Sequence, residues 1–383
     1  MQVSTFSKIK RKLAAAASVE TWRDLLGCTA SFAGVEPHLA AAVDWMTHSI
    51  QATNGQGFAA HYRIGKGWGS GYPETTGYIL PTLLCLSEKR GRRDLEKAAI
   101  QQAEWLLTTQ LPSGGFPGGE IQLGLEETVF NTGQILRGLI AAWEKSGNSK
   151  FQDSALRGAT WLLSVQDPDG AWRRFTSPLT PAKEHAYDVL TAWGLFMAGK
   201  TFEQPEFCEA ALKQYGWTQS LQKLNGFFAQ ASFDQQGDTL SHPLAYVVEG
   251  IYEIALITDD PKGIESCLTL LHTLQKNFSQ SSFLPGILNQ ELEAKSTWSC
   301  VTGNLQFGWM AVRIGRHEND AELVQWGTKL IKTSAACQRL QSPNPGIRGG
   351  VFGSNPIYGD YFPYTTLNWA TKYLIDALLE ISE

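Results

Sequence analysis

The fold is decided by the segment Trp161-Leu-Leu-Ser-Val-Gln-Asp-Pro-Asp-Gly-Ala-Trp172, in which a tryptophan is followed five residues later by a glutamine and then by a loop with glycine and an aromatic residue. The same pattern recurs around Gln110 and Gln222, each of which is 56 residues from Gln166. Looser copies of the pattern surround Gln51, Gln275 and Gln338. Six copies at a nearly constant spacing predict one helical hairpin repeated six times.

A second apolar stretch, rich in small and aromatic residues, follows each of the six loops. These stretches are 76–86, 132–143, 187–198, 249–257, 302–314 and 366–381. The helices before the loops have alternating polar positions, so we expect them to form an outer ring around the more apolar helices. Because one hairpin cannot bury its apolar stripe alone, the repeats must stack. The sequence therefore predicts an all-α, (α/α)6 toroid as a single domain over 37–383, a helical extension at 1–36, and almost no β-structure.

The composition excludes some partners and compartments. Apolar residues make up 43% of the chain and the net charge is −5, so a nucleic-acid surface is not expected. The short basic run 8–12 is interpreted as the solvated start of a helix, with a peripheral contact to an anionic membrane as the alternative. No stretch has the length of a membrane span or the pattern of a signal peptide. Six scattered cysteines, such as Cys85 in an apolar stretch, indicate reduced, buried thiols in a cytoplasmic protein.

Titratable residues concentrate where the inner helices begin. The long loops should meet at this end of the toroid, which is called the rim below. Glu74, Asp188 and Glu249 are the best candidates for the two carboxyl groups that glycosidic chemistry requires. His185 and His242 are candidate general bases for a lyase or an epimerase. Each group also has a structural interpretation: Glu74 as a helix N-terminal charge, Asp188 as a bridge between inner helices, and His242 as a helix-entry cap.

Aromatic and polar side chains at the same rim predict a sugar site, because the C–H faces of sugars stack on aromatic rings and their hydroxyls bond to polar groups. The candidate substrate-binding residues are Trp68, Tyr72, Asn131, Trp172, His185, Tyr246, Trp298, Asn304, Arg348, Tyr361 and Tyr364. Structural packing is the alternative for the aromatic residues of the glycine loops, Trp172 among them. The chain has neither zinc-ligand spacing nor a dinucleotide or phosphate loop, so we expect no metal and no cofactor.

Two resemblances add to this interpretation. The glutamine–glycine–aromatic loops resemble the glutamine–tryptophan repeats of squalene–hopene cyclases and protein prenyltransferase β subunits over most of the chain. However, the sequence has neither the Asp-x-Asp-Asp motif of the cyclases nor the Asp-x-Cys zinc pair of the prenyltransferases. The resemblance therefore implies the fold and not those activities.

The segment Gly69-Ser-Gly-Tyr-Pro-Glu-Thr-Thr-Gly-Tyr-Ile-Leu-Pro81 resembles the signature of VpsJ-like polysaccharide biosynthesis proteins, bacterial toroid proteins encoded with exopolysaccharide and O-antigen genes. That resemblance implies a glycan-related role without defining a reaction. The residues that it singles out are Tyr72, Glu74, Thr75, Thr76 and Tyr78.

Three functional hypotheses follow from the sequence. The first is a hydrolase, lyase or epimerase that acts on a sugar or a lipid-linked oligosaccharide in bacterial polysaccharide biosynthesis, alongside other synthesis enzymes. The second is an isoprenoid-binding protein similar to terpene cyclases or prenyltransferases, which requires an apolar aromatic cavity. The third is a non-catalytic scaffold of a polysaccharide synthesis complex, in which the rim carboxyl groups would be dispensable.

Overall fold

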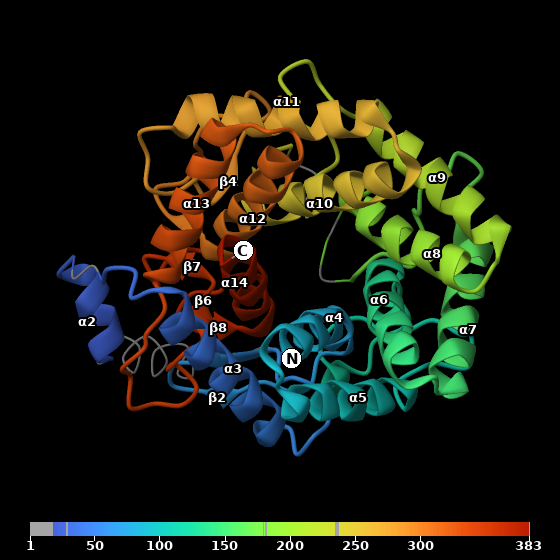
Figure 1. Ribbon diagram of the computed structural model, residues 1–383, viewed down its shortest axis with the longest axis horizontal. Coiled ribbons are helices and arrows are strands. Elements are labelled where there is room, and N and C mark those ends of the chain that lie inside the picture. Colours follow the sequence, from blue (N-terminus) through green and yellow to red (C-terminus); the bar gives the residue numbers. More distant parts are fainter. Residues whose placement is uncertain (1–17, 28–29, 179, 181, 234–236, 383) are drawn as a thin grey trace.

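The computed structural model describes residues 18–27, 30–178, 180, 182–233 and 237–382. Its helices form two concentric rings around one axis, which confirms the predicted (α/α)6 toroid (Figure 1). The outer ring is made of α3 (Val35–Ala52), α5 (Arg93–Leu107), α7 (Ser149–Val165), α9 (Pro205–Ser220), α11 (Pro261–Phe278) and α13 (Ala321–Ala335). The inner ring is made of α4 (Pro73–Arg90), α6 (Val129–Ser146), α8 (Val189–Thr201), α10 (Ser241–Thr258), α12 (Val301–His317) and α14 (Asn368–Ile381).

All six predicted inner helices are present, although four of the predicted ranges were too narrow and those of α8 and α14 began two residues early. The largest error is in α10, which was expected at 249–257 and begins at Ser241. His242 was interpreted as a possible helix-entry cap, but it lies inside the first turn with Pro243, where proline is tolerated because its missing N–H has no intrahelical partner. The start of α10 is therefore buried at the axis, and Glu249 lies about two turns into the helix.

The near absence of strands was wrong in detail, because short antiparallel strands tie the rim loops together. Strands β2 (Gly67–Trp68), β1 (His61–Arg63), β8 (Thr365–Leu367) and β6 (Val351–Phe352) form one sheet in that order. Two further pairs join β3 (Thr239–Leu240) to β4 (Ile287–Leu288) and β5 (Ser299–Cys300) to β7 (Ser354–Asn355). Strands of two or three residues are too short to show the period-two alternation that identifies a strand in a sequence.

The repeated glutamine has a structural role that explains the pattern. The Nε2 of Gln110 donates to the carbonyl of Gly114 in its own loop, at 2.8 Å, and to the carbonyl of Ser154 in the next outer helix, at 2.9 Å. The equivalent bonds join Gln166 to Gly170 and Ala210, and Gln222 to Gly226 and Ser266. In these three repeats one side chain thus fixes the turn and connects consecutive hairpins, which explains the glutamine at this position.

The same device closes the ring between the last hairpin and the first. Gln338 donates to the carbonyls of Gly349 and His38, and its Oε1 lies 2.7 Å from Nδ1 of His38. The sheet β2-β1-β8-β6 also pairs the first rim loop with the last one. The toroid is therefore closed by hydrogen bonds at two levels, and its six repeats surround a common axis.

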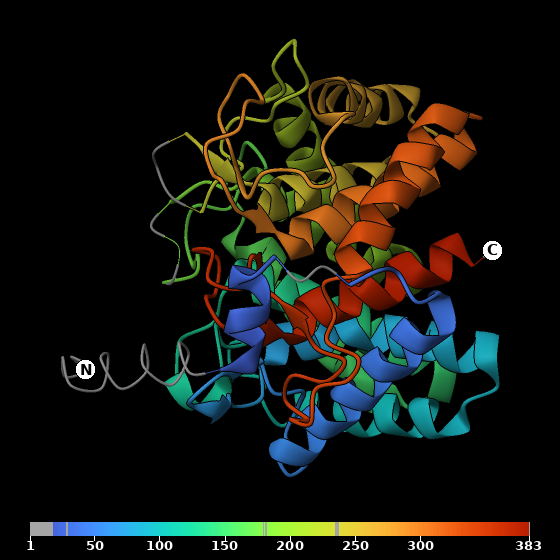
Figure 2. The same cartoon turned by 90° about the vertical axis from the view of Figure 1, so that its left-hand side faces the viewer.

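Glycine at the helix contacts allows the inner ring to be narrow. A Cβ added to Gly138 of α6 would lie 2.2 Å from the carbonyl oxygen of Gly77 in α4, and one added to Gly194 of α8 would lie 2.4 Å from that of Gly133 in α6. These backbones are in direct contact, which brings the starts of α4, α6 and α8 close to one another. Figure 2 shows the long loops gathered toward one side of the toroid, where these helices start.

The N-terminal helix α2 (Val19–Leu25) is held against the toroid through its polar face. Arg339 donates to Glu20 at 3.0 Å and also bonds to Asp24, whereas Trp22 on the opposite face is 54% exposed. The predicted basic contact at 8–12 lies outside the described residues, and the division of the chain at 36 remains a prediction. None of the helices in the described part of the chain is long and apolar enough to cross a membrane.

The cysteines are only partly as expected. Cys85, Cys208, Cys267, Cys300 and Cys337 are all unpaired thiols, and Cys28 lies outside the described residues. The prediction that Cys85 is buried was wrong: its side chain is exposed, because it lies on the face of α4 that is turned away from the core.

Candidate functional site

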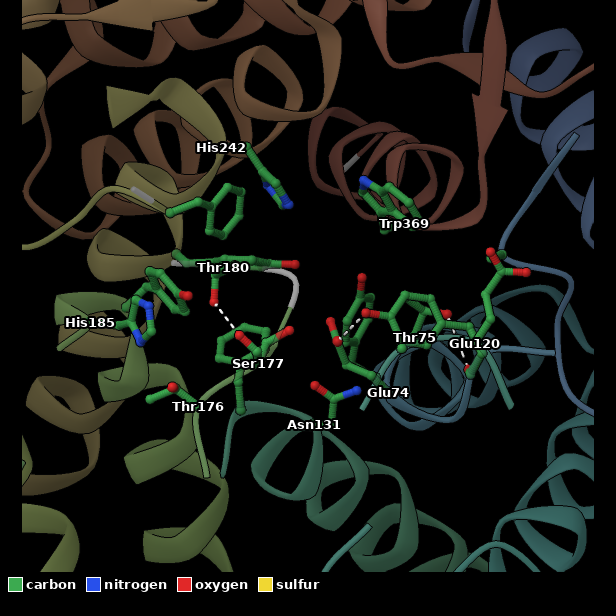
Figure 3. A pocket seen from close by; sticks show the side chains of 18 of the residues that line it. Glu74, Thr75, Glu120, Asn131, Thr176, Ser177, Thr180, His185, His242 and Trp369 are labelled. Atoms are coloured by element: carbon green, nitrogen blue, oxygen red, sulfur yellow. Dashed lines mark hydrogen bonds between the residues drawn. The ribbon is translucent and has the colours of Figure 1, made fainter. Parts of the chain in front are cut away.

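A cavity of about 420 Å³ lies at the rim end of the axis, within the size range of small-molecule sites. Its walls are built from the starts of α4, α6, α10 and α14, from the 3-10 helix η2 (Ala186–Asp188) before α8, and from the rim loops. Figure 3 shows Glu74, Asn131, His185, His242 and Trp369 around one open space, each from a different part of the inner ring.

Glu74 is a buried carboxyl group in the first turn of α4. Its side chain is part of a residue that is only 7% exposed, and Tyr72 donates a hydrogen bond of 2.7 Å to its Oε2. Burial raises the pKa of Glu74 to about 7, and the bond from Tyr72 only partly opposes this. Between about pH 4.5 and 7, Glu74 therefore holds a proton that an ordinary glutamate has lost, which suits a general acid.

His185 and Asp188 form a pair on the opposite side of the cavity from Glu74, as Figure 3 shows for His185. Nδ1 of His185 lies 3.8 Å from Oδ2 of Asp188, and both residues are at most 3% exposed. Burial raises the pKa of Asp188, and the neighbouring His185 opposes the shift. Nε2 of His185 is buried and has no hydrogen-bond partner among the described residues. A buried unpaired ring nitrogen beside a cavity is poised to bond to a ligand.

His242 is neutral at physiological pH. Burial lowers the pKa of its imidazole to about 4, although a hydrogen bond to Gln306 opposes the shift. Nδ1 lies 2.6 Å from Oε1 of Gln306, so the neutral ring donates from Nδ1 and keeps the lone pair on Nε2. His242 is therefore suited to accept a hydrogen bond from a ligand hydroxyl through Nε2. It does not act as a cation at this pH.

An aromatic belt surrounds the cavity. It is defined by rings in successive contact, with centroids 5.1–6.3 Å apart: Tyr72, Trp369, Phe362, Tyr361, His242, Phe233, Tyr187 and Phe130. Burial raises the pKa of Tyr72, Tyr187 and Tyr361 above the ordinary tyrosine value, so these rings keep their hydroxyl protons. The belt offers flat apolar faces together with neutral hydroxyl groups.

A second acidic group, Glu120, lies at the mouth of the cavity. Its Oε2 accepts bonds from the backbone N–H of Ser70 at 2.8 Å and from the Ser70 hydroxyl at 3.1 Å. Its Oε1 lies 3.5 Å from Nδ1 of His61, and burial lowers the pKa of His61. The 3-10 helix η1 (Ile121–Leu123) that follows Glu120 completes this edge of the mouth.

The axis is filled beneath the cavity by a buried ionic group. Glu249, one turn beyond the cavity residue Tyr246 on α10, lies 3.3 Å from Nη2 of Arg137 and accepts a 2.8 Å bond from the hydroxyl of Tyr373. Lys372 lies 3.9 Å from the centroid of the Tyr373 ring and pairs with Asp376. Glu249, Arg137, Tyr373 and Lys372, called the floor residues below, are each at most 4% exposed. The cavity is therefore closed at this end.

The structure brings together eight of the residues predicted from the sequence. Glu74, Asp188 and His242 line the cavity with Tyr72, Asn131, His185, Tyr246 and Tyr361.

Seven others lie outside the cavity lining. Glu249 is a floor residue, Trp68 packs against Trp45, and Trp172 is buried and donates to the carbonyl of Leu162. Asn304 bonds to the backbone of Leu284, and Arg348 donates to the carbonyl of Ser342. Trp298 packs against Gly286, and Tyr364 packs in a small apolar cluster with Ile347. The sequence placed these residues near the rim, but it did not show that their side chains pack inside the protein and not in the cavity.

Several lining residues were missed. Phe130, Tyr187 and Trp369 each lie within the first turn of an inner helix or directly before one, which was the available signal. Phe233 and Glu120 lie in loops, and no sequence signal marks them. In the described part of the chain, no group of three His, Cys, Asp or Glu side chains is placed to hold a metal ion.

Comparison with known proteins identifies the fold and no family. No family model matches the chain, and no curated protein matches it. The chain is similar to an unsaturated glucuronyl hydrolase from Bacillus sp. GL1, with a TM-score of 0.71 and 12% identity over 91% of this chain and 97% of that one. It is similar to an unsaturated glucuronyl hydrolase specific for heparin, with a TM-score of 0.70 and 17% identity over 91% and 96%.

A third similar structure is a possible member of the GH105 family from Salmonella enterica, with a TM-score of 0.64 and 14% identity over 90% of this chain and 93% of that one. At this level of identity the similarity concerns the fold. The chain thus has the (α/α)6 toroid of these proteins over nearly its whole length.

Proposed function

We propose that the protein is a carbohydrate-active hydrolase that removes the terminal sugar from a glycan. The observation that carries the proposal is the pairing, across one aromatic-walled cavity, of the protonated Glu74 with the His185–Asp188 pair. Two such groups on either side of a bond are what hydrolysis of a glycosidic linkage requires.

The roles follow from the protonation of each group. Glu74 gives its proton to the glycosidic oxygen as the bond from that oxygen to the anomeric carbon breaks. A water molecule on the other side attacks the anomeric carbon and passes its proton to the His185–Asp188 pair. The products are the free sugar and the shortened glycan, and the proton later returns to Glu74 through solvent.

The aromatic belt supports this chemistry in two ways. The faces of Trp369 and Tyr361 suit the C–H face of a sugar ring, and the tyrosine hydroxyls suit its hydroxyl groups. The π-faces also attract the positive charge that develops on the ring in an oxocarbenium-like transition state.

The floor residues support action at a chain end. Because the axis is closed beneath Tyr246, a glycan cannot thread through the toroid and must enter and leave by the rim. A volume of about 420 Å³ accommodates one or two sugar rings. A closed cavity of this size suits removal of a terminal residue rather than cleavage inside a long chain.

The known proteins with this fold also support a role in carbohydrate chemistry, since two of the similar structures are described as unsaturated glucuronyl hydrolases. The proposal extends to a cytoplasmic role in polysaccharide biosynthesis on the basis of the segment 69–81. Four of the residues that this segment's resemblance singles out, Tyr72, Glu74, Thr75 and Tyr78, line the cavity. The fifth, Thr76, accepts a bond from the backbone N–H of Phe58 and positions the rim loop.

The test is turnover of a defined oligosaccharide library by the purified full chain, with released monosaccharide measured by mass spectrometry. We expect Glu74→Gln and Asp188→Asn each to reduce kcat by at least about 100-fold, the size of a general acid–base contribution. Glu104→Gln, on the exposed face of the outer helix α5, is the matched control and should leave kcat unchanged.

The activity of the unsubstituted protein should fall as the pH rises through about 7, because Glu74 then loses the proton that it must donate. Failure to turn over or bind any member of the library contradicts the proposal. Exchange of deuterium from solvent into a sugar carbon would instead indicate elimination or epimerisation, with His185 as the base.

An isoprenoid-binding function is the second candidate, favoured by the aromatic belt. A protonated carboxyl group such as Glu74 among aromatic rings is also suited to protonating an alkene and stabilising the carbocation. Native mass spectrometry with farnesol distinguishes the two candidates. A farnesol adduct that is lost in Phe233→Ser, together with no binding of any glycan, would favour the isoprenoid function.

A further inference from the structure

We infer that the sugar enclosed by the cavity is uncharged, so that a ring carrying a carboxylate, sulfate or phosphate group is excluded. This inference rests on the proposed function and names the substrate class of the same site. It separates the protein from its structural neighbours, two of which are described as glucuronyl hydrolases, one of them specific for heparin.

The acidic groups of the cavity are the first observation. Glu74 and Asp188 lie on its walls and Glu120 lies at its mouth. Among the described residues that line the cavity, none is a lysine or an arginine. The neighbouring residues outside the described ranges in these loops are Leu179, Pro181 and the segment 234–236, and the sequence of that segment, Asp-Gln-Gln, contains no basic residue.

The second observation is that several basic side chains around the axis and the rim are bound to other groups. Arg137 and Lys372 are floor residues and pair with Glu249 and Asp376. Arg173 is bound to Asp167, Asp169 and Glu184, away from the cavity. Arg63 donates its Nε to the hydroxyl of Thr365, and Arg63 and Lys66 both act electrostatically on the lining residue His61. None of these cations is among the residues that line the cavity, and neither is Lys183, an exposed residue of the loop before His185.

The physical consequence is a penalty for a buried anion. Moving an ionised carboxylate out of water costs several kcal/mol unless it gains an opposite charge or several strong hydrogen bonds. Sites that recognise carboxylates or sulfates usually supply arginine for this purpose. Here the walls supply aromatic faces, tyrosine hydroxyls, the amide of Asn131 and further carboxyl groups. The rings, hydroxyls and amide suit the C–H faces and hydroxyl groups of a sugar, and the carboxyl groups, once ionised, repel an anion.

The same arrangement leaves room for charge elsewhere in the glycan. Arg63 and Lys66 act electrostatically on His61 but do not line the cavity, so they are available to the leaving part of a glycan that extends beyond it. A negative charge on that part of the substrate is therefore compatible with the inference, which concerns only the enclosed ring.

The test compares matched pairs of methyl glycosides that differ only in charge. The probes are glucoside with glucuronide, galactoside with galacturonide, and N-acetylglucosaminide with its 6-sulfate, each titrated into the full chain by calorimetry at pH 7.5. We expect the neutral member of any pair that binds to bind at least about 10-fold more tightly. Equal or tighter binding of the acidic member of any pair overturns the inference.

A pair of variants at the mouth provides an internal check. Leu123 lines the cavity and is 52% exposed, so a longer polar side chain is accommodated there without loss of core packing. Leu123→Arg introduces the missing cation and should reduce the discrimination between neutral and acidic members several-fold. Leu123→Gln, similar in reach but uncharged, should leave the discrimination unchanged. Identical effects of the two variants would contradict the electrostatic explanation.

The outcomes also separate this inference from the proposed function. Binding of acidic rings with turnover would leave the hydrolase in place and refute only the substrate class. Binding of neither member of any pair counts against the proposed function and removes the basis of the inference with it.

Discussion

Replacement of Glu74 by glutamine should make the protein more stable at neutral and alkaline pH. Folding transfers this carboxyl group from water into the cavity wall, where burial raises its pKa from the ordinary 4.5 to about 7. The folded state thus binds the proton more tightly than the unfolded state. Stability is therefore lost as the pH rises from about 4.5 to about 7, and the loss is constant above that range.

The magnitude follows from the size of the shift. A difference of about 2.5 pKa units at roughly 1.4 kcal/mol per unit corresponds to about 3 kcal/mol of unfolding free energy. Glutamine does not titrate and retains an acceptor for the hydroxyl of Tyr72. The stability of Glu74→Gln minus that of the unsubstituted protein should therefore rise by about 3 kcal/mol between pH 4.5 and 8.

The assay is urea unfolding of both proteins at several pH values in this range, followed by tryptophan fluorescence. Taking the difference between the two proteins removes the titration of all the other groups, including Asp188, whose pKa burial also raises. Glu104→Gln on the exposed face of α5 is the control and should give a difference that does not vary with pH. A flat or falling difference for Glu74→Gln would refute the claim that this carboxyl group is buried and protonated.

The other predictions concern the architecture that positions the cavity, and each is measured by urea unfolding. Gln166→Ala removes the two bonds that connect consecutive hairpins and should destabilise the protein by about 1–3 kcal/mol. Glu249→Ala leaves Arg137 buried without its partner and should cost about 3–5 kcal/mol, whereas Glu249→Gln should cost less. Gly138→Ala places a Cβ against the backbone of α4 and should destabilise the protein by about 1–3 kcal/mol. Gly216→Ala in α9, where the added Cβ meets no other atom, should stabilise the protein by about 0.5–1 kcal/mol.

These predictions have defined controls and contrary outcomes. Gln101→Ala, at an exposed position of α5, should change stability by less than about 0.5 kcal/mol. A similar cost for Gln166→Ala would show that its bonds contribute nothing beyond those of a surface side chain. Equal effects of the two glycine substitutions would contradict the close contact of α4 and α6, and a neutral Glu249→Ala would contradict the buried ionic pair.

The sequence was sufficient to predict the fold because several repeats use the same glutamine and glycine at equivalent positions. A glutamine that bonds simultaneously to its own loop and to the next outer helix leaves a periodic trace, as do glycines such as Gly114, whose φ of 100° favours glycine. The two rings were separable because the outer helices expose a polar stripe along their length, whereas the inner helices are apolar and buried over most of theirs. The short rim strands left no trace because pairing of two residues imposes no pattern.

The candidate site was only partly predictable, and Glu74 and Glu249 show the reason. Both are acidic residues on inner helices, and both are buried at the axis. Glu249 lies one turn deeper than the cavity and meets Arg137, which is 112 residues away in sequence, whereas Glu74 meets the cavity and its near neighbour Tyr72. The depth of a residue along the axis and its distant partners are set by the packing of six repeats, which no local pattern records. The same holds for Trp172 and Asn304, whose bonds to backbone groups turn them away from the cavity.

The bond between Gln338 and His38 has a topological consequence. Since the last hairpin is joined to the first by the same kind of glutamine bond that joins the hairpins at Gln110, Gln166 and Gln222 to the next ones, the position at which the chain starts is arbitrary with respect to the closed ring. A circularly permuted chain, with its original ends connected and new ends opened in the short turn between α8 and α9, should reach the same tertiary structure. In that case the arrangement of the repeats around the axis would not depend on which repeat is synthesised first.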